Sequence, residues 1–171
     1  MPDTAPLILT LALDAAAFAR FDALRRAHFP PERNHIPAHL TLFHHLPGGE
    51  LPAIATALAE AAGRRAPFPL AVTGLRPLGR GVAYAIESPP LLALRGALAA
   101  RWAAWLTPQD RQPLRPHVTV QNKVAPAAAA ALLAELAAEF APWTATAEGL
   151  LLWRYRGGPW EAAGRFPFAP G

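Results

Sequence analysis

The order of expected elements constrains the fold most, because the same order occurs twice along the chain. Each half contains a strand, a helix, a proline-rich loop, a strand that begins with His-x-Thr, a second helix and a further strand. The repeat is about half of the chain, too long for a solenoid unit, so it predicts two related lobes that face each other. We expect one domain over residues 1–171, with half-repeats at roughly 5–76 and 80–156.

Apolar runs, helical periodicity and the positions of proline and glycine predict where the elements lie. Asp14 is the expected N-cap of the first helix. Strands are expected at 7–13, 39–46, 68–75, 82–88, 117–124, 144–156 and 160–168, and helices at 15–29, 50–63, 89–105 and 126–140. Because hairpins and helices mix rather than strictly alternate, the expected fold is α+β, with two pseudo-symmetric lobes of mostly antiparallel strands and outer helices around a central cleft.

The composition excludes several kinds of site. The chain has no cysteine, which excludes disulfides, thiolate metal sites and a cysteine nucleophile. Its net charge is +4, and arginine supplies all of the basic residues except Lys123. Arginine suits contact with phosphate, although dispersed arginines also fit a solvated surface. The N-terminus lacks the basic region of a signal peptide and no apolar run reaches the length of a membrane helix, so we expect a cytoplasmic protein without membrane contact. No coiled coil, long disordered tail or large exposed apolar stretch points to an obligate partner, so we expect a monomer.

Two short strands contain the residues best suited to catalysis. Side chains alternate along a strand, so His39 and Thr41 emerge on one face, as do His117 and Thr119 in the second half. If the lobes face each other, both pairs meet in one cleft. In-line displacement at phosphorus needs a base and an acid on opposite sides, and two histidines can serve at neutral pH. The threonine hydroxyls can then bind non-bridging phosphate oxygens, and no cofactor is required.

The remaining histidines are interpreted as ordinary helix-end, loop or strand residues. They are His28, His35, His44 and His45. His45 shares strand parity with His39 and could border the cleft. A zinc site made by His39, His45 and His117 is conceivable, but neither strand carries a carboxylate and the chain has no His-x-His or HExxH spacing. We therefore expect no metal site.

Three residues close to the motifs are candidates for substrate binding. Phe43 has the parity of His39 and could stack on a base, although an aromatic residue at this spacing also fits a core. Gln121 has the parity of His117. Arg115 lies just before the second motif and could pair with a phosphate, or it could be a solvated loop residue.

The last long strand offers a further candidate, Tyr155. Trp153 and Tyr155 share one face of this strand, and Arg154 and Arg156 share the other. Interleaved aromatic and basic residues can bind RNA, but an amphipathic strand gives the same pattern. Both interpretations stay open on the sequence.

The motifs "HLTL" at 39–42 and "HVTV" at 117–120 resemble the paired H-x-T-x motifs of the 2H phosphoesterase superfamily, in its 2′-5′ RNA ligase-like branch. The resemblance covers the whole chain in element order and implies a two-lobed α+β fold with a central cleft. It also implies that His39 and His117 are the acid and base and that Thr41 and Thr119 hold the phosphate. Some RNA-acting members have an arginine shortly after the second motif, whereas this chain has 121–123 as Gln-Asn-Lys.

The expected function is metal-independent hydrolysis of 2′,3′-cyclic phosphates on RNA ends or small nucleotides. A non-catalytic module that binds RNA or phosphorylated ligands is the alternative, and 2′-5′ end joining by the same histidines is a third possibility. The chain has no P-loop sequence of the GxxxxGK[ST] type, which argues against joining driven by ATP through a P-loop. Near-symmetry hides which histidine is the base and which ribose oxygen leaves.

Overall fold

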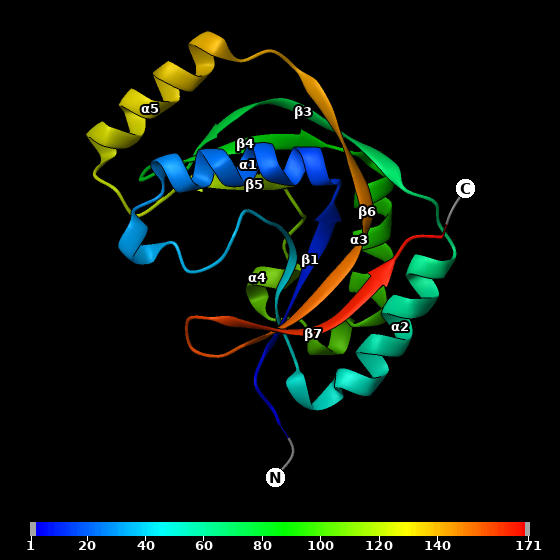
Figure 1. Ribbon diagram of the computed structural model, residues 1–171. Helices are drawn as coiled ribbons and strands as arrows, with labels where there is room; N and C mark the ends of the chain where they lie inside the picture. The colour runs from blue at the N-terminus through cyan, green and yellow to red at the C-terminus, as the bar shows by residue number, and fades with distance from the viewer. Residues whose placement is uncertain (1–2, 170–171) are drawn as a thin grey trace.

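The computed structural model describes residues 3–169 (Figure 1). Its strands are β1 (Leu7–Leu13), β2 (Leu40–Leu46), β3 (Phe68–Pro77), β4 (Val82–Glu87), β5 (His117–Gln121), β6 (Trp143–Tyr155) and β7 (Trp160–Pro167). Its α-helices are α1 (Ala15–His28), α2 (Leu51–Gly63), α3 (Pro89–Arg101), α4 (Pro108–Arg111) and α5 (Pro126–Glu139). The α+β class is confirmed, and each predicted strand and helix is present, although the helix expected at 89–105 ends at Arg101 and the strand expected at 117–124 ends at Gln121. The short helix α4 lies in a segment expected to be a loop. No helix within residues 3–169 has the length and apolar character needed to cross a membrane.

The sheet has the strand order β2-β1-β6-β3-β4-β5, β7 pairs with β6, and every pairing is antiparallel. Exchanging β1 with β4, β2 with β5 and β3 with β6 gives the same order in reverse. Two related halves would produce this pattern. The boundaries of the half-repeats stay a prediction.

Strand β6 joins the two parts of the sheet. Its first residues pair with β3, and the rest of the strand pairs with β1 on one side and β7 on the other. The sheet curls so far that its two terminal strands, β2 and β5, contact each other. Helix α1 packs on β5, α5 packs on β3 and β4, and α2 packs on β7 and β6 (Figure 1). Curling therefore brings the two motif strands together.

Local signals explain how the first helix is placed. The Asp14 side chain accepts a hydrogen bond from the Ala17 backbone N–H at 2.9 Å, which confirms the predicted N-cap. The second carboxylate oxygen accepts from the Thr146 N–H of β6 at 2.7 Å. Along α1, the fully buried Phe21 packs against the aromatic rings of Tyr84 and Trp143. One carboxylate thus starts the helix and ties it to the central strand.

Burial of the motif strands follows the predicted alternation as far as the threonines. Leu40 and Leu42 on β2, and Val118 and Val120 on β5, are fully buried. The histidines and threonines between them keep part of their surface exposed. The apolar side chains therefore anchor each strand in the core and leave the imidazole and hydroxyl groups free on the other face.

Strand β2 departs from regular alternation directly after its motif. Leu9 on β1 pairs with Phe43, but the next residue, Thr10, pairs with Thr41, so β2 contains one extra residue at this point. The bulge turns Phe43 into the core beside Leu42, where it has no exposed surface. The expectation that Phe43 shares the face of the motif residues is therefore wrong.

Strand β5 has a bulge at the corresponding place. Val82 on β4 pairs with Gln121, whereas Ala83 pairs with Thr119. Gln121 is only 7% exposed, and within residues 3–169 its buried Oε1 has no hydrogen-bond partner. The bulge thus moves Gln121 away from the face that regular alternation predicts.

Candidate active site

One cavity brings the two His-x-Thr motifs together. The motif cavity, as we call it, has a volume of about 170 Å³. Its lining consists of both motif pairs and three further side chains: Ile8, His39, Thr41, His44, His117, Thr119 and Trp160. Residues 78 positions apart in the sequence thus face the same small space, because β2 and β5 meet where the sheet curls.

The two motif imidazoles are held in the same way. Nδ1 of His39 lies 2.9 Å from the carbonyl oxygen of Pro37, and Nδ1 of His117 lies 2.8 Å from that of Arg115. A carbonyl oxygen only accepts, so we assign the proton of the neutral His39 ring to Nδ1. On His117, Nδ1 lies within hydrogen-bond distance both of the Arg115 carbonyl and of the donor Nη1 of Arg76, so each tautomer of the neutral ring has a partner there. Because Nδ1 faces these protein groups on both rings, Nε2 is the nitrogen available to a substrate. Arg76 Nη1 also donates to the Arg115 carbonyl at 3.3 Å.

The surroundings favour neutral imidazoles. Burial lowers the pKa of His39 to about 4, and the nearby positive charge of Arg25 acts in the same direction. Burial also lowers the pKa of His117, and the guanidinium of Arg76, whose Nη1 is 3.0 Å from Nδ1, adds to the effect. A phosphate anion between the rings would oppose both shifts, because an opposite charge favours the protonated form.

Trp160, at the start of β7, forms one wall of the motif cavity. Its ring lies 4.8 Å from that of His39, centre to centre, at an angle of 58°. Trp153 lies 6.1 Å behind it, and the Trp153 Nε1–H donates to the Thr10 hydroxyl at 2.9 Å. Trp160 is not among the residues expected from the sequence to form the site. The available signal was an aromatic residue directly after the Gly-Gly-Pro turn of the last hairpin.

A larger, mainly apolar cavity adjoins the motif cavity and shares His39 and Trp160 with it. We call it the apolar cavity, and its volume is about 400 Å³. Aromatic and aliphatic groups from β1, α1, β6 and the loop before β2 make up most of its walls, among them Leu11, Leu13, Phe18, Ile36, Leu151 and Trp153. Such a cavity is large enough for a nucleobase or another flat organic group.

A third cavity adjoins the motif cavity and shares Thr41, His44 and His117 with it. We call it the basic cavity, and its volume is about 260 Å³. Arg76 and Arg115 both line it. The motif cavity therefore has an apolar neighbour and a cationic neighbour.

His44 belongs to the motif cavity and to the basic cavity, although its position in the sequence looked ordinary. The bulge at Phe43 shifts strand parity by one residue, so His44, and not His45, continues the face of His39 and Thr41. The exposed His45 side chain is not among those that line the motif, apolar or basic cavity.

Two buried arginines hold the motif strands from behind. Arg25 of α1 donates from Nη1 to the Thr119 carbonyl at 3.1 Å, and Arg95 of α3 donates from Nε to the Leu42 carbonyl at 3.1 Å. These two arginines are 4% and 7% exposed. Because β2 and β5 are the terminal strands of the curled sheet, such bonds satisfy carbonyls that a neighbouring strand would otherwise take.

The structure brings only one of the four candidate substrate-binding residues to the cavities of the site. Arg115 is exposed at the basic cavity, as its candidate role requires. Phe43 packs in the core against Trp102, and Gln121 is buried, so the structure brings neither to the motif cavity. Tyr155 lies exposed at the end of β6, and its side chain is not among those that line the motif, apolar or basic cavity.

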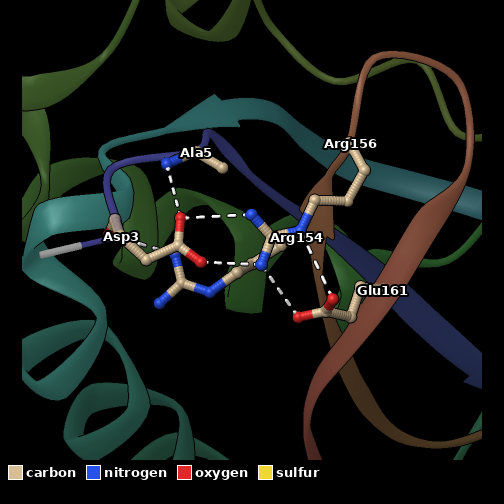
Figure 2. Close-up of polar contacts among 5 residues, drawn as sticks. All are labelled: Asp3, Ala5, Arg154, Arg156 and Glu161. Carbon is tan, nitrogen blue, oxygen red and sulfur yellow. Dashed lines mark hydrogen bonds and ion pairs between the residues drawn. The ribbon is translucent and has the colours of Figure 1, made fainter. Parts of the chain in front are cut away.

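The arginines next to Tyr155 form ion pairs, as Figure 2 shows. Arg156 Nη2 lies 2.6 Å from an Asp3 carboxylate oxygen and 3.0 Å from Glu161 Oε1. Arg154 Nη1 lies 3.5 Å from Asp3, which also accepts from the Ala5 N–H. These contacts tie the N-terminal segment to the last hairpin and use the arginines that a strand-based RNA surface would need.

Within residues 3–169, no three His, Asp or Glu side chains lie close enough to hold a metal ion. His39 and His117 meet in one cavity, but His45 points elsewhere. The zinc arrangement considered from the sequence therefore lacks its third ligand in this part of the chain.

Comparisons with known proteins agree with this geometry. Among solved structures, TT0787 of Thermus thermophilus superimposes with a TM-score of 0.69 at 21% identity, over 96% of this chain and 98% of that one. Escherichia coli LigT in complex with 3′-AMP gives a TM-score of 0.60 at 20% identity, over 98% and 99%. No curated protein matched. These likenesses establish the fold, and a family model described as the 2′-5′ RNA ligase superfamily matches residues 13–159, so the chain belongs to that superfamily.

Proposed function

We propose that this protein is a phosphoesterase that hydrolyses 2′,3′-cyclic phosphates of RNA ends or nucleotides with two histidines as acid and base. The observation that carries the proposal is the motif cavity, in which two imidazoles and two threonine hydroxyls line a space of about 170 Å³. Each imidazole has its Nδ1 bound to a backbone carbonyl, so the same nitrogen is available on both rings. Membership of the superfamily supports this class of reaction.

The reaction requires one neutral and one protonated histidine. Water attacks phosphorus while the neutral imidazole takes its proton, and a new P–O bond forms as the bond to one ribose oxygen breaks. The protonated imidazole donates its proton to that departing oxygen. The hydroxyls of Thr41 and Thr119 donate hydrogen bonds to the non-bridging oxygens, where negative charge grows.

The pKa of His39 suggests a division of roles. A group with a pKa of about 4 is neutral at pH 7, which suits the base. The role of acid then falls to His117, whose protonation the charge of the bound phosphate would favour. With a ribose hydroxyl in place of water as the nucleophile, the same two groups could open the cyclic phosphate and join it to that hydroxyl.

The apolar cavity supports a nucleoside as the group attached to the phosphate. It adjoins His39, and the two tryptophans at that wall could stack on a base. Solved structures of LigT hold 3′-AMP and phosphate, so a protein of this fold accommodates a nucleotide. We propose the same class of substrate for this chain.

The test is hydrolysis of nucleoside 2′,3′-cyclic monophosphates, and of a short RNA with a cyclic-phosphate end, in the presence of EDTA. His39→Ala and His117→Ala should each lower kcat/KM by about 10²- to 10⁴-fold. His45→Ala is the matched control, because this neighbouring histidine is exposed and should leave the rate unchanged. Near-full activity in both motif variants would refute the proposal, and a longer RNA product would reveal joining.

A further inference from the structure

The basic cavity, which adjoins the motif cavity through other residues than the apolar cavity does, is lined mainly by cationic and polar groups. The basic cavity opens beside Thr41 and His117. Its charged and potentially charged lining residues are three arginines, one further histidine and one carboxylate: Arg76, Arg95, Arg115, His44 and Asp110. The scissile phosphate needs only the motif residues, so the arginines and His44 are not used by the reaction proposed above. They lie where a neighbouring part of the substrate would extend.

A buried carboxylate holds His44 in place. The Asp110 side chain has no exposed surface, and its oxygens accept from the backbone N–H groups of His44 and His45, each at 2.9 Å. The same carboxylate lies 3.3 Å from Nδ1 of His44. Nδ1 is therefore the protonated nitrogen that faces Asp110, and Nε2 is the nitrogen available to a ligand.

The charge of Asp110 is maintained although the group is buried. Burial alone would raise the pKa of Asp110, but the hydrogen bonds from His44 and His45 outweigh it and hold the pKa below its ordinary range. Arg95 lies behind this unit and donates from Nη2 to the Asp110 carbonyl at 2.7 Å. The ionised carboxylate accepts at Nδ1 and so fixes the orientation of the His44 ring, with Nε2 turned away from Asp110.

We propose that His44, Arg76 and Arg115 form a binding site for a second phosphate group of the substrate. This inference rests on the proposed function and narrows its substrate class. The substrate would be a nucleotide that carries a cyclic phosphate at one end and a further phosphate at its 5′ oxygen. The last nucleotide of an RNA chain has this structure, whereas a cyclic mononucleotide does not.

The connectivity of a nucleotide fits the three cavities in order. The base and the 5′ carbon leave the ribose ring at positions that flank the edge bearing the 2′ and 3′ oxygens. With the cyclic phosphate in the motif cavity and the base in the apolar cavity, the 5′ phosphate extends toward the basic cavity. A guanidinium has five N–H donors, so Arg76 can bind a phosphate while Nη1 holds the Arg115 carbonyl.

The test measures binding and does not depend on turnover. Isothermal titration calorimetry on the full chain would compare 3′-AMP with adenosine 3′,5′-bisphosphate, two ligands that differ by the second phosphate. We expect the bisphosphate to bind about tenfold more tightly, as one charge-assisted contact commonly provides. His44→Gln should bring the affinity ratio close to one. Arg115→Gln, a change at an exposed side chain that should not affect folding, should lower the ratio as well.

His45→Gln is the matched control and should keep the wild-type ratio. Equal affinities of the wild-type protein for the two ligands, or failure to bind either, would overturn the second site, as would a ratio that survives both substitutions. The two proposals fail separately. A protein that hydrolyses cyclic phosphates but binds both ligands equally keeps the proposed function, and one that prefers the bisphosphate without any turnover keeps only the second site.

Discussion

The low pKa of His39 links the motif cavity to the stability of the whole protein. A histidine whose folded pKa lies below its unfolded value takes up a proton more readily in the unfolded chain. Its reference pKa is 6.5 and its folded pKa is about 4, so the free energy of unfolding falls as the pH drops through this interval. Between pH 7 and pH 5 these two values correspond to a loss of about 2 kcal/mol from His39 alone.

Replacing His39 with glutamine should remove this loss. Urea denaturation at pH 7 and pH 5 would give the free energy of unfolding of wild type and His39→Gln under matched salt. The wild type should lose about 2 kcal/mol more than the variant between the two pH values. His117→Gln should change the pH dependence in the same direction, because burial lowers that pKa as well.

An equal pH dependence of stability in wild type and His39→Gln would refute this reasoning. Titration of every group other than His39 is common to both proteins, so it cancels in the difference between them. If wild type and His39→Gln lose the same stability on acidification, His39 titrates alike in the folded and unfolded chains. The assignment of His39 as a neutral base at pH 7 would then lose its basis.

Two further predictions concern the walls of the site. Trp160→Ala should weaken 3′-AMP binding about tenfold, which is the value of one base-stacking contact, and should change the affinity for inorganic phosphate less. Tyr155→Ala is the control, because Tyr155 pairs with Trp160 across the same hairpin. Equal effects of the two substitutions on 3′-AMP binding would contradict the role of Trp160. Arg25→Met should cost about 2 kcal/mol of stability in urea denaturation, because it leaves the buried carbonyl of Thr119 without its donor. Arg26→Met is the control, because the exposed Arg26 forms only a surface ion pair with Asp22, and this change should cost less than about 1 kcal/mol of stability. Similar losses of stability in the two variants would contradict the role of Arg25 in holding β5.

The sequence predicted elements well where the determinants are local. Asp14 caps α1 through a bond to a residue three positions later, and Pro126 opens α5 at the first helical position. The alternation of His39, Leu40 and Thr41 likewise needs only regular strand geometry. Signals of this kind lie within a few residues, so a single sequence contains them.

The bulges were beyond this kind of reasoning. The prediction of which side chains share a face assumes that each residue of β2 pairs with one residue of β1. Leu9 pairs with Phe43 but the next residue, Thr10, pairs with Thr41, so Leu42 is an extra residue on β2. The shift turns Phe43 inward and His44 outward, which reverses the two expectations made from parity. Whether a strand bulges depends on its partner strand and on the core behind it, neither of which is local in sequence.

Asp110 was missed for a related reason. It lies in a proline-broken segment and bonds to His44, 66 residues earlier, so no sequence window contains both. A local sign did exist, since Thr107 is followed by proline and then by an acidic residue at the third position, which is typical of a helix start. The Thr107 hydroxyl accepts from the Asp110 N–H at 3.3 Å. That sign would have predicted the helix but not the histidine that its aspartate holds.

The features that the two halves share and the features in which they differ have separate consequences for the chemistry. Matching His-x-Thr motifs give two equivalent imidazoles, which is what acid and base on opposite sides of a phosphorus require. Equivalent groups alone would let a substrate bind in either direction. Both strands bulge directly after their motif, and β2 has a second register shift further along. The residue five positions after the motif histidine is His44 in one half and Asn122 in the other. The motif cavity is therefore asymmetric, because His44 and the aromatic ring of Trp160 have no counterparts in the other half. A substrate with a base at one end and a phosphate at the other would then be bound in a single orientation.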